Sequence, residues 1–144
     1  MIDRVLIVCV GNICRSPMAE SALRHRLAGE AIVVESAGLA ALVGSPIDPL
    51  AESVLVEHGL SAKHHVARQV DASLIGAADV VLAMDRRHVS AILALAPHAR
   101  GKTFLLGRWQ GDIEIADPYG QPRDVFEQTY RMIDEAVGSW RMHI

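Results

Sequence analysis

A near-continuous apolar run close to the start of the chain limits the folds open to it. Residues 4–10 read RVLIVCV, and Gly11 follows them. A β-branched run that does not alternate between polar and apolar positions is typical of a strand buried on both faces. Such a strand lies inside a parallel sheet, and the sheet needs helices on both faces. The run therefore favours an α/β fold.

The remainder of the chain alternates between strand-like and helix-like segments. Short β-branched runs separate stretches in which apolar residues recur at spacings of three and four. We expect strands at residues 4–10, 32–37, 79–84 and 103–106, and helices at residues 17–28, 48–58, 86–96 and 121–143. This order predicts a single domain over residues 1–144, a doubly wound, flavodoxin-like, four-stranded parallel sheet with helices on both faces. Ligands bind such sheets beyond the carboxyl ends of the strands.

The composition argues against several classes of protein. Of the 144 residues, 51% are hydrophobic and 22% are charged, which is too apolar for a disordered chain. The net charge of −3 argues against a nucleic-acid binder, which needs clustered Lys and Arg. The first apolar run is too short to span a bilayer and follows no basic leader, so we expect a cytoplasmic protein without membrane insertion.

Only two cysteines are present, Cys9 and Cys14. A secreted domain of this size that relied on disulfides would carry more, and a four-cysteine zinc site is excluded by number. The seven histidines show no spacing that completes a ligand set, and the adjacent His64 and His65 are expected to face solvent. We therefore expect no metal and no cofactor, and we interpret the cysteines as carriers of chemistry.

The segment that joins the first expected strand to the first expected helix reads CVGNICRSP, residues 9–17. Its tight turn directs backbone N–H groups inward, where the positive end of the helix dipole helps them to hold an anion. Gly11 permits a positive φ, Asn12 tolerates the left-handed conformation, and Arg15 offers a planar fork to two phosphate oxygens. The expected phosphate-binding residues are Val10, Gly11, Asn12, Ile13, Cys14, Arg15 and Ser16.

The first residue of this segment is the expected nucleophile. Inward N–H groups, the helix N-terminus, Arg15 and the Ser16 hydroxyl would all favour a thiolate at Cys9. We also expect Ser16 to be the N-cap of the helix that starts at Pro17. A lone Cys after a strand is usually a small buried apolar residue, but its spacing to Arg-Ser-Pro argues for a nucleophile.

The same segment resembles the signature loop of the low molecular weight protein tyrosine phosphatases. That signature, Cys, four residues, then Cys-Arg-Ser/Thr-Pro, is matched from Cys9 to Pro17. The similarity continues through residues 36–38, 46–51 and 117–119. The resemblance implies the fold of that family and hydrolysis of phosphotyrosine through a cysteinyl-phosphate intermediate.

Two further segments are most similar to a bacterial subgroup of that family. Residues 37–44 and 101–109 are similar to enzymes encoded with capsule or exopolysaccharide systems. The subgroup implies a phosphotyrosine protein as partner, namely the tyrosine-rich tail of a membrane tyrosine autokinase, with dephosphorylation tuning polymer synthesis or export. The family also implies a monomer.

A proton donor is the second chemical requirement, because the departing phenolate has a conjugate acid with a pKa of about 10. Asp117 fits, since Pro118 and Gly120 mark a turn before the last helix. Alone this segment would be an ordinary turn, but with the Cys9 loop it predicts a general acid. Tyr119 is expected to wall the substrate ring, and the resemblance implies Leu39 as the opposing wall. Many relatives carry two adjacent aromatics here, so Gly120 leaves ring selectivity open.

Several other residues carry alternative interpretations. Cys14 is a candidate to trap oxidised Cys9 as a disulfide, or it packs beneath the loop. Asp85 either caps the helix of residues 86–96 or braces the site. Arg86, Arg87 and His88 are expected at a solvated helix start, or they receive an acidic phosphopeptide. A buried stripe is expected on the last helix, formed by Phe126, Tyr130, Ile133, Val137 and Trp140.

Three rival functions fit parts of the pattern. An arsenate reductase has a similar fold and anion loop but needs further cysteines to relay electrons, and none follows Cys14. A phosphocarrier module that holds phosphate on a strand-end Cys needs neither Arg15 nor Asp117. A phosphate-binding pseudoenzyme would not need nucleophile, clamp and acid together, and this sequence contains all three.

Overall fold

The computed structural model describes residues 1–144. Its four strands form one parallel sheet: β1 (Arg4–Cys9), β2 (Val33–Gly38), β3 (Val80–Ala83) and β4 (Thr103–Leu105). The order across the sheet is β2-β1-β3-β4, so the winding reverses between β1 and β3. The expected doubly wound α/β sheet is confirmed, and its switch point lies at the carboxyl end of β1.

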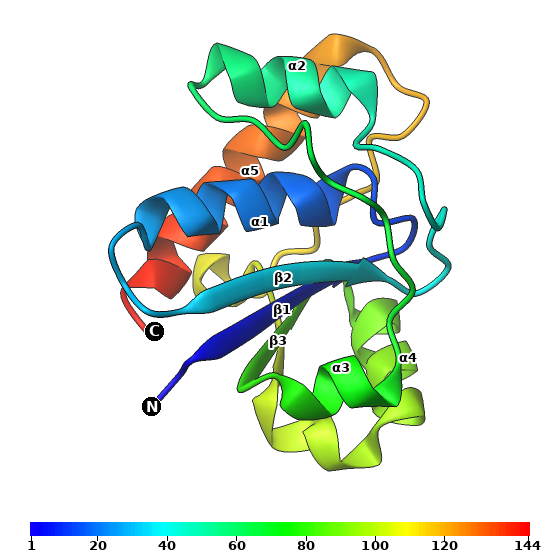
Figure 1. Cartoon of the computed structure of the whole chain (residues 1–144), viewed down its shortest axis with the longest axis vertical. Coiled ribbons are helices and arrows are strands. Elements are labelled where there is room, and N and C mark those ends of the chain that lie inside the picture. Colours follow the sequence, from blue (N-terminus) through cyan, green and yellow to red (C-terminus); the bar gives the residue numbers. More distant parts are fainter.

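Five α-helices cover the sheet: α1 (Arg15–Arg26), α2 (Pro49–Glu57), α3 (Ala72–Ala77), α4 (Arg86–Leu95) and α5 (Arg123–Arg141). Helices α1, α2 and α5 lie over one face, and α3 and α4 lie over the other (Figure 1). Two 3-10 helices, η1 (Pro97–Lys102) and η2 (Arg108–Gln110), flank β4. None of the helices combines the length and the hydropathy needed to cross a bilayer.

β1 divides the core in two, because successive side chains of a strand point to opposite faces. Val5, Ile7 and Cys9 belong to the core under α1, α2 and α5, whereas Leu6 and Val8 belong to the core over α3 and α4. All five residues are at most 2% exposed, which accounts for the unbroken apolar run. The alternation also places the Cys9 side chain on the α1 face.

Some element boundaries differ from the sequence prediction. α1 begins at Arg15, and the prediction of Ser16 as its N-cap is wrong because the Ser16 hydroxyl contacts Cys9 instead. Helix α3 was not expected, since its six residues are too few to show a helical period. Asp71 caps it by accepting the N–H of Leu74 at 2.8 Å. The buried stripe on α5 is confirmed, although that helix ends at Arg141.

β2 is an edge strand whose outer carbonyl groups are covered by arginine side chains. Arg24 donates from Nε and Nη2 to the Val34 carbonyl at 3.1 and 2.8 Å, and Arg68 donates from Nε to the Ser36 carbonyl at 3.0 Å. These contacts block pairing of this edge with another strand. The Arg68 contact also places a cation near the end of β2 that lies next to the Cys9 loop.

Candidate active site

The loop between β1 and α1, residues 9–16, is held in place by hydrogen bonds that its carbonyl groups accept from surrounding residues. The carbonyls of Cys9–Cys14 all accept hydrogen bonds, at 2.6 to 3.2 Å, from the backbone N–H groups of Leu39, Ala40, Leu42, Asp48 and Met18 and from the ring of His65. No backbone N–H of residues 10–16 donates to an acceptor in the protein. Because the carbonyls turn outward, the N–H groups turn inward and form an anion-binding cup.

Two backbone features allow this loop to close. Asn12 is fully buried and has a φ of 58°, so the left-handed position is at Asn12. The left-handed conformation that Asn12 was expected to tolerate is confirmed, whereas Gly11 does not use the positive φ that it permits, and a Cβ at Gly11 would make only ordinary contacts. Gly38 at the end of β2 is the glycine that the loop requires, since a Cβ there would fall on the Val10 carbonyl.

The Asn12 side chain links the loop to β2. Its Nδ2 donates to the hydroxyls of Ser16 (2.8 Å) and Ser36 (3.0 Å), and its Oδ1 accepts the N–H of Arg68 at 2.9 Å. Ser36 in turn donates to Glu20 Oε1 at 2.5 Å. Every polar atom of the buried Asn12 amide therefore has a partner, which fixes its orientation.

The Cys9 sulfur lies at the base of the cup, 2.9 Å from the Ser16 hydroxyl oxygen. The Asn12 amide already donates to that oxygen, which leaves the hydroxyl hydrogen of Ser16 free to point at the sulfur. A donated hydrogen bond favours the charged form of an acid. The Ser16 hydroxyl is therefore placed to donate a hydrogen bond to the Cys9 sulfur.

Arg15 is only 3% exposed and lies against the cup. Its Nη1 donates to the Ile115 carbonyl at 2.8 Å, and its Nη2 lies 3.8 Å from Asp117 Oδ2. The buried Nε has no partner in the protein. An anion in the cup would satisfy this donor, which fits the predicted role of Arg15 as a phosphate clamp.

A pocket of about 200 Å³ opens above Cys9. Arg15 and Asp117 line it, as do Val10, Gly11, Ile13, Cys14, Ala40, Leu42 and Tyr119. The structure thus brings together the predicted nucleophile, clamp and acid. Leu39 does not line the pocket, because it packs against the core beside α3 and α4. Ala40 and Leu42 are the side chains of this segment that line the pocket with Tyr119.

The acid loop, residues 115–121, is more open than the cup. The Asp117 side chain is 51% exposed and Tyr119 is 59% exposed. Asp117 Oδ1 accepts the N–H of Tyr119 at 3.1 Å, and Gly120 takes a φ of 77° in the turn. This leaves Asp117 Oδ2 directed toward Arg15, beside the pocket.

Cys14 is buried and forms no disulfide in this structure. Burial raises the pKa of its thiol far above the ordinary value of 9.0, and the charges of Asp48, Asp117 and Cys9 raise it further, against the opposing effect of Arg15. Cys14 is therefore a neutral thiol at physiological pH.

Two histidines differ from their predicted places. His65 does not simply face solvent, because its Nε2 donates to the Asn12 carbonyl at 2.6 Å across 53 positions of sequence. His88 is not at a solvated helix start: it is 6% exposed, because α4 turns it inward beside Asp85 (3.5 Å). Burial lowers the pKa of His88, Arg15 and Arg87 add to that effect, and Asp85 opposes it. No local sequence signal marks either contact.

Asp85 caps α4 as predicted, accepting the N–H of His88 at 2.9 Å. Its pKa is lowered, because this hydrogen bond and the nearby charges of His88, Arg87 and Arg15 outweigh the opposing effect of burial. No group of three His, Cys, Asp or Glu side chains is placed to hold a metal ion.

Comparison with known proteins places this geometry in a family. Residues 4–144 match the family model "Low molecular weight phosphotyrosine protein phosphatase". Among curated relatives, the low molecular weight protein-tyrosine-phosphatase Wzb of Salmonella typhimurium is 44% identical over 140 residues, which cover 97% of this chain and 93% of that protein. The Wzb protein of Escherichia coli K12 is 45% identical over 140 residues, which cover 97% of this chain and 94% of that protein.

Solved structures agree. Vibrio vulnificus Wzb in complex with benzylphosphonate has a TM-score of 0.96 and 38% identity, with both chains covered completely. The arginine phosphatase YwlE of Geobacillus stearothermophilus has a TM-score of 0.91 and 36% identity, over 98% of this chain and 92% of that one. With the family model matched over nearly every residue, the chain belongs to the low molecular weight phosphotyrosine protein phosphatase family.

Proposed function

We propose that this chain hydrolyses phosphotyrosine in proteins through a cysteinyl-phosphate intermediate, with Cys9 as nucleophile, Arg15 as clamp and Asp117 as acid and base. The observation that carries the proposal is the orientation of the backbone groups in residues 9–16. Their carbonyls point outward, their N–H groups point inward, and the thiol of Cys9 lies at the base. Such a cup stabilises a dianion and the charge of a transferring phosphoryl group.

In the first step the Cys9 thiolate attacks phosphorus in line, and a sulfur–phosphorus bond forms as the bond to the phenol oxygen breaks. The inward N–H groups and Arg15 hold the three equatorial oxygens. Asp117 gives its proton to the departing oxygen. Its position beside the pocket and near Arg15 supports this role.

In the second step Asp117, now ionised, takes a proton from water as the water oxygen attacks phosphorus. The sulfur–phosphorus bond breaks, inorganic phosphate leaves, and Cys9 returns to its thiolate. Arg15 and the loop supply the positive charge that a metal supplies in other phosphoryl transfers, so this proposed mechanism uses no metal.

The pocket walls support an aromatic substrate over a charged one. Val10, Ile13, Leu42 and Tyr119 offer apolar surface to a neutral ring, and Asp117 is the one carboxylate that lines the pocket. YwlE is named an arginine phosphatase, so phosphoarginine is the alternative substrate class. The apolar lining favours phosphotyrosine, because a guanidinium leaving group would lose solvation against these walls.

For the physiological partner we propose a phosphotyrosine protein, the tail of a membrane tyrosine autokinase that controls exopolysaccharide synthesis or export. The relatives named Wzb, AmsI and EpsP support this assignment through the subgroup resemblance. We further propose a cytoplasmic, monomeric single-domain enzyme. Loss of the phosphotyrosine signal from such a tail on incubation with wild type is expected, and its persistence would argue for other targets.

The central test is turnover of para-nitrophenyl phosphate in the presence of a metal chelator. Wild type is expected to turn over, and Cys9→Ser to lose at least about 10⁴-fold in rate, because the nucleophile is removed. Phosphotyrosine and phosphoarginine peptides are compared in parallel. Activity that survives in Cys9→Ser would end the proposed mechanism, and faster turnover of phosphoarginine would replace the proposed substrate.

A further inference from the structure

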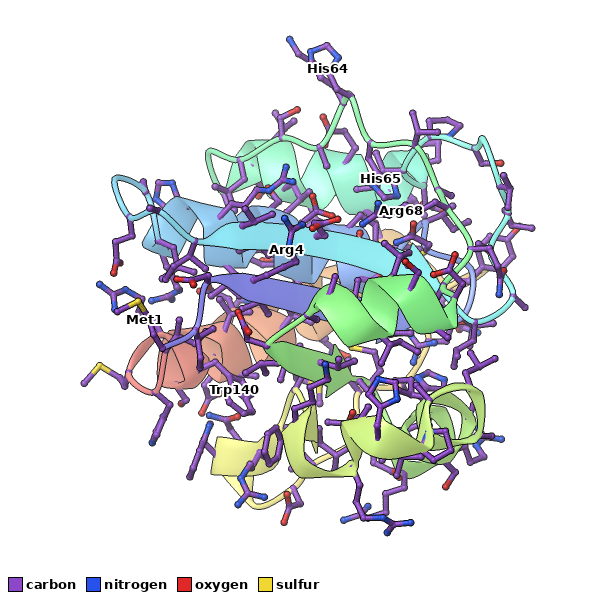
Figure 2. The ribbon with its side chains drawn as sticks, turned by 60° about the horizontal axis from the view of Figure 1, so that its bottom comes forward. Met1, Arg4, His64, His65, Arg68 and Trp140 are labelled. Atoms are coloured by element: carbon purple, nitrogen blue, oxygen red, sulfur yellow. The ribbon has the colours of Figure 1, made fainter.

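A second and larger cavity lies behind the Cys9 loop. It has a volume of about 810 Å³ and opens between α1, β2 and residues 59–68. Polar side chains dominate its lining, among them Glu20, Arg24, Ser36, Lys63, His65 and Arg68. None of its lining residues belongs to the pocket above Cys9. Figure 2 shows His65 and Arg68 close to β2, with His64 projecting outward from the same segment.

The charges around this cavity favour an anion. Its permanent cations are Arg24, Lys63 and Arg68, and its carboxylates are Glu20 and Glu35, which leaves one positive charge before any histidine is protonated. Glu20 is paired with Arg24 at 2.8 Å, and Glu35 is paired with Arg68 at 2.5 Å and with Arg4. Lys63 takes part in no ion pair, and three histidines, His25, His64 and His65, also line the cavity.

The inner wall of the cavity is made of residues that hold Asn12. His65 donates to the Asn12 carbonyl, the Arg68 N–H donates to the Asn12 side chain, and Ser36 accepts from it. His65 uses Nε2 for this contact, so Nδ1 is left without a protein partner on a residue that lines the cavity. A ligand in the cavity thus touches the groups that shape the phosphate loop.

We propose that this cavity is an effector site for a small polyanion, and that its occupancy is transmitted to the phosphate loop through His65. A bound anion favours the protonated imidazole, which donates from Nδ1 to the anion and from Nε2 to Asn12. The charge strengthens the hydrogen bond to the Asn12 carbonyl. Binding therefore stabilises the loop from behind without entering the cup.

The test is an NMR titration of the full chain with citrate, a polyanion without a phosphoryl group, and orthovanadate is titrated into a separate sample to report on the cup. Saturable shifts are expected at the amides of residues 61–66 and at Asn12, and the ring protons of His65 should move toward imidazolium values. Lys63→Ala should weaken citrate binding about fivefold, because one partly exposed charge contact is lost. Acetate at matched ionic strength should produce no saturable shifts.

Arg100→Ala is the matched control, since Arg100 is an exposed cation on η1 that does not line the cavity. It should bind citrate like wild type. Chemical-shift changes that are confined to residues 9–16, or that do not saturate with citrate, would overturn the effector site. Equal loss of citrate affinity in Lys63→Ala and Arg100→Ala would also overturn it. An effector role for the cavity rests on the proposed phosphatase function, but binding of citrate does not. Failure of orthovanadate to bind would count against the phosphatase function, whereas the shifts at residues 61–66 report on the cavity alone.

Discussion

The phosphate loop and the acid loop meet at one pocket but are held in opposite ways. Residues 9–16 are mostly buried, the carbonyls of Cys9–Ile13 are fixed by contacts from distant parts of the chain, and that of Cys14 is bonded within α1. The acid loop is anchored at Ile115, whose N–H donates to the Met84 carbonyl and whose carbonyl accepts from Arg15. Beyond Ile115, the hydrogen bonds of this loop are local, such as the one between Tyr119 and Asp117, and Asp117 Oδ2 lies 3.8 Å from Arg15.

The buried phosphate loop and the more open acid loop meet two different requirements of the proposed reaction, phosphate binding and proton transfer. Binding and charge stabilisation need donors that are already oriented, which explains a rigid, buried cup. Proton transfer to a bulky leaving group needs an acid that the substrate can reach, and the half-exposed Asp117 meets that need in the proposed mechanism. Substitutions in the two loops should therefore fail in different ways.

Among the substitutions that compare the two loops, Asp117→Asn should lower the rate most and change the folding stability least. We expect turnover of phenyl phosphate, a poor leaving group, to fall by about 10³-fold, and that of para-nitrophenyl phosphate by less than about tenfold, because an activated phenolate needs no acid. The melting temperature should stay close to that of wild type, since the side chain is exposed. Equal losses on both esters would contradict the acid role.

Gly38→Ala should show the opposite pattern. The added Cβ falls on the Val10 carbonyl, so the phosphate loop has to move, and we expect a loss of about 100-fold on both esters and about 1–3 kcal/mol of stability. Gly101→Ala is the control, because a Cβ there meets nothing within 4 Å. An active, stable Gly38→Ala protein would show that the cup is less rigid than its contacts indicate.

Ser16→Ala probes one bond inside the cup and should cost less. Removing the hydroxyl that faces the Cys9 sulfur should lower both the turnover and the rate of Cys9 alkylation by iodoacetate about tenfold, as expected for a hydrogen bond to a charged group. Ser73→Ala, at an exposed position on α3, should behave as wild type. An unchanged rate of Cys9 alkylation in Ser16→Ala would show that the Ser16 hydroxyl does not stabilise the thiolate.

Cys14→Ala should give the smallest effect, confined to alkaline pH. In the native state the pKa of Cys14 is raised, so above pH 9.0 the unfolded chain releases this proton while the native protein keeps it, and stability falls as pH rises. Cys14→Ala should flatten that part of the decline in the free energy of unfolding, measured by urea titration. Cys9→Ser should retain the decline in the free energy of unfolding at alkaline pH. Equal pH profiles for wild type and Cys14→Ala would show that Cys14 does not cause that decline.

Much of the fold follows from local patterns. The run of residues 4–10, the caps at Asp48 and Asp85, and the apolar stripe of α5 each reflect a period or a side-chain contact within a few residues. Helix α3 escaped prediction because six residues carry no period. The candidate nucleophile, clamp and acid were identified by residue type and spacing, which is local information for Cys9 and Arg15.

The sequence by itself determined the doubly wound sheet and the loop that carries Cys9, Asn12 and Arg15, because period, turn chemistry and spacing act over short stretches. Only the tertiary structure decided what holds that loop. His65, Arg68 and Gly38 reach it across dozens of residues, and their contacts depend on how β2 and the segment after α2 pack beside β1. Such long-range packing leaves no periodic trace, so a histidine expected in solvent became part of the site.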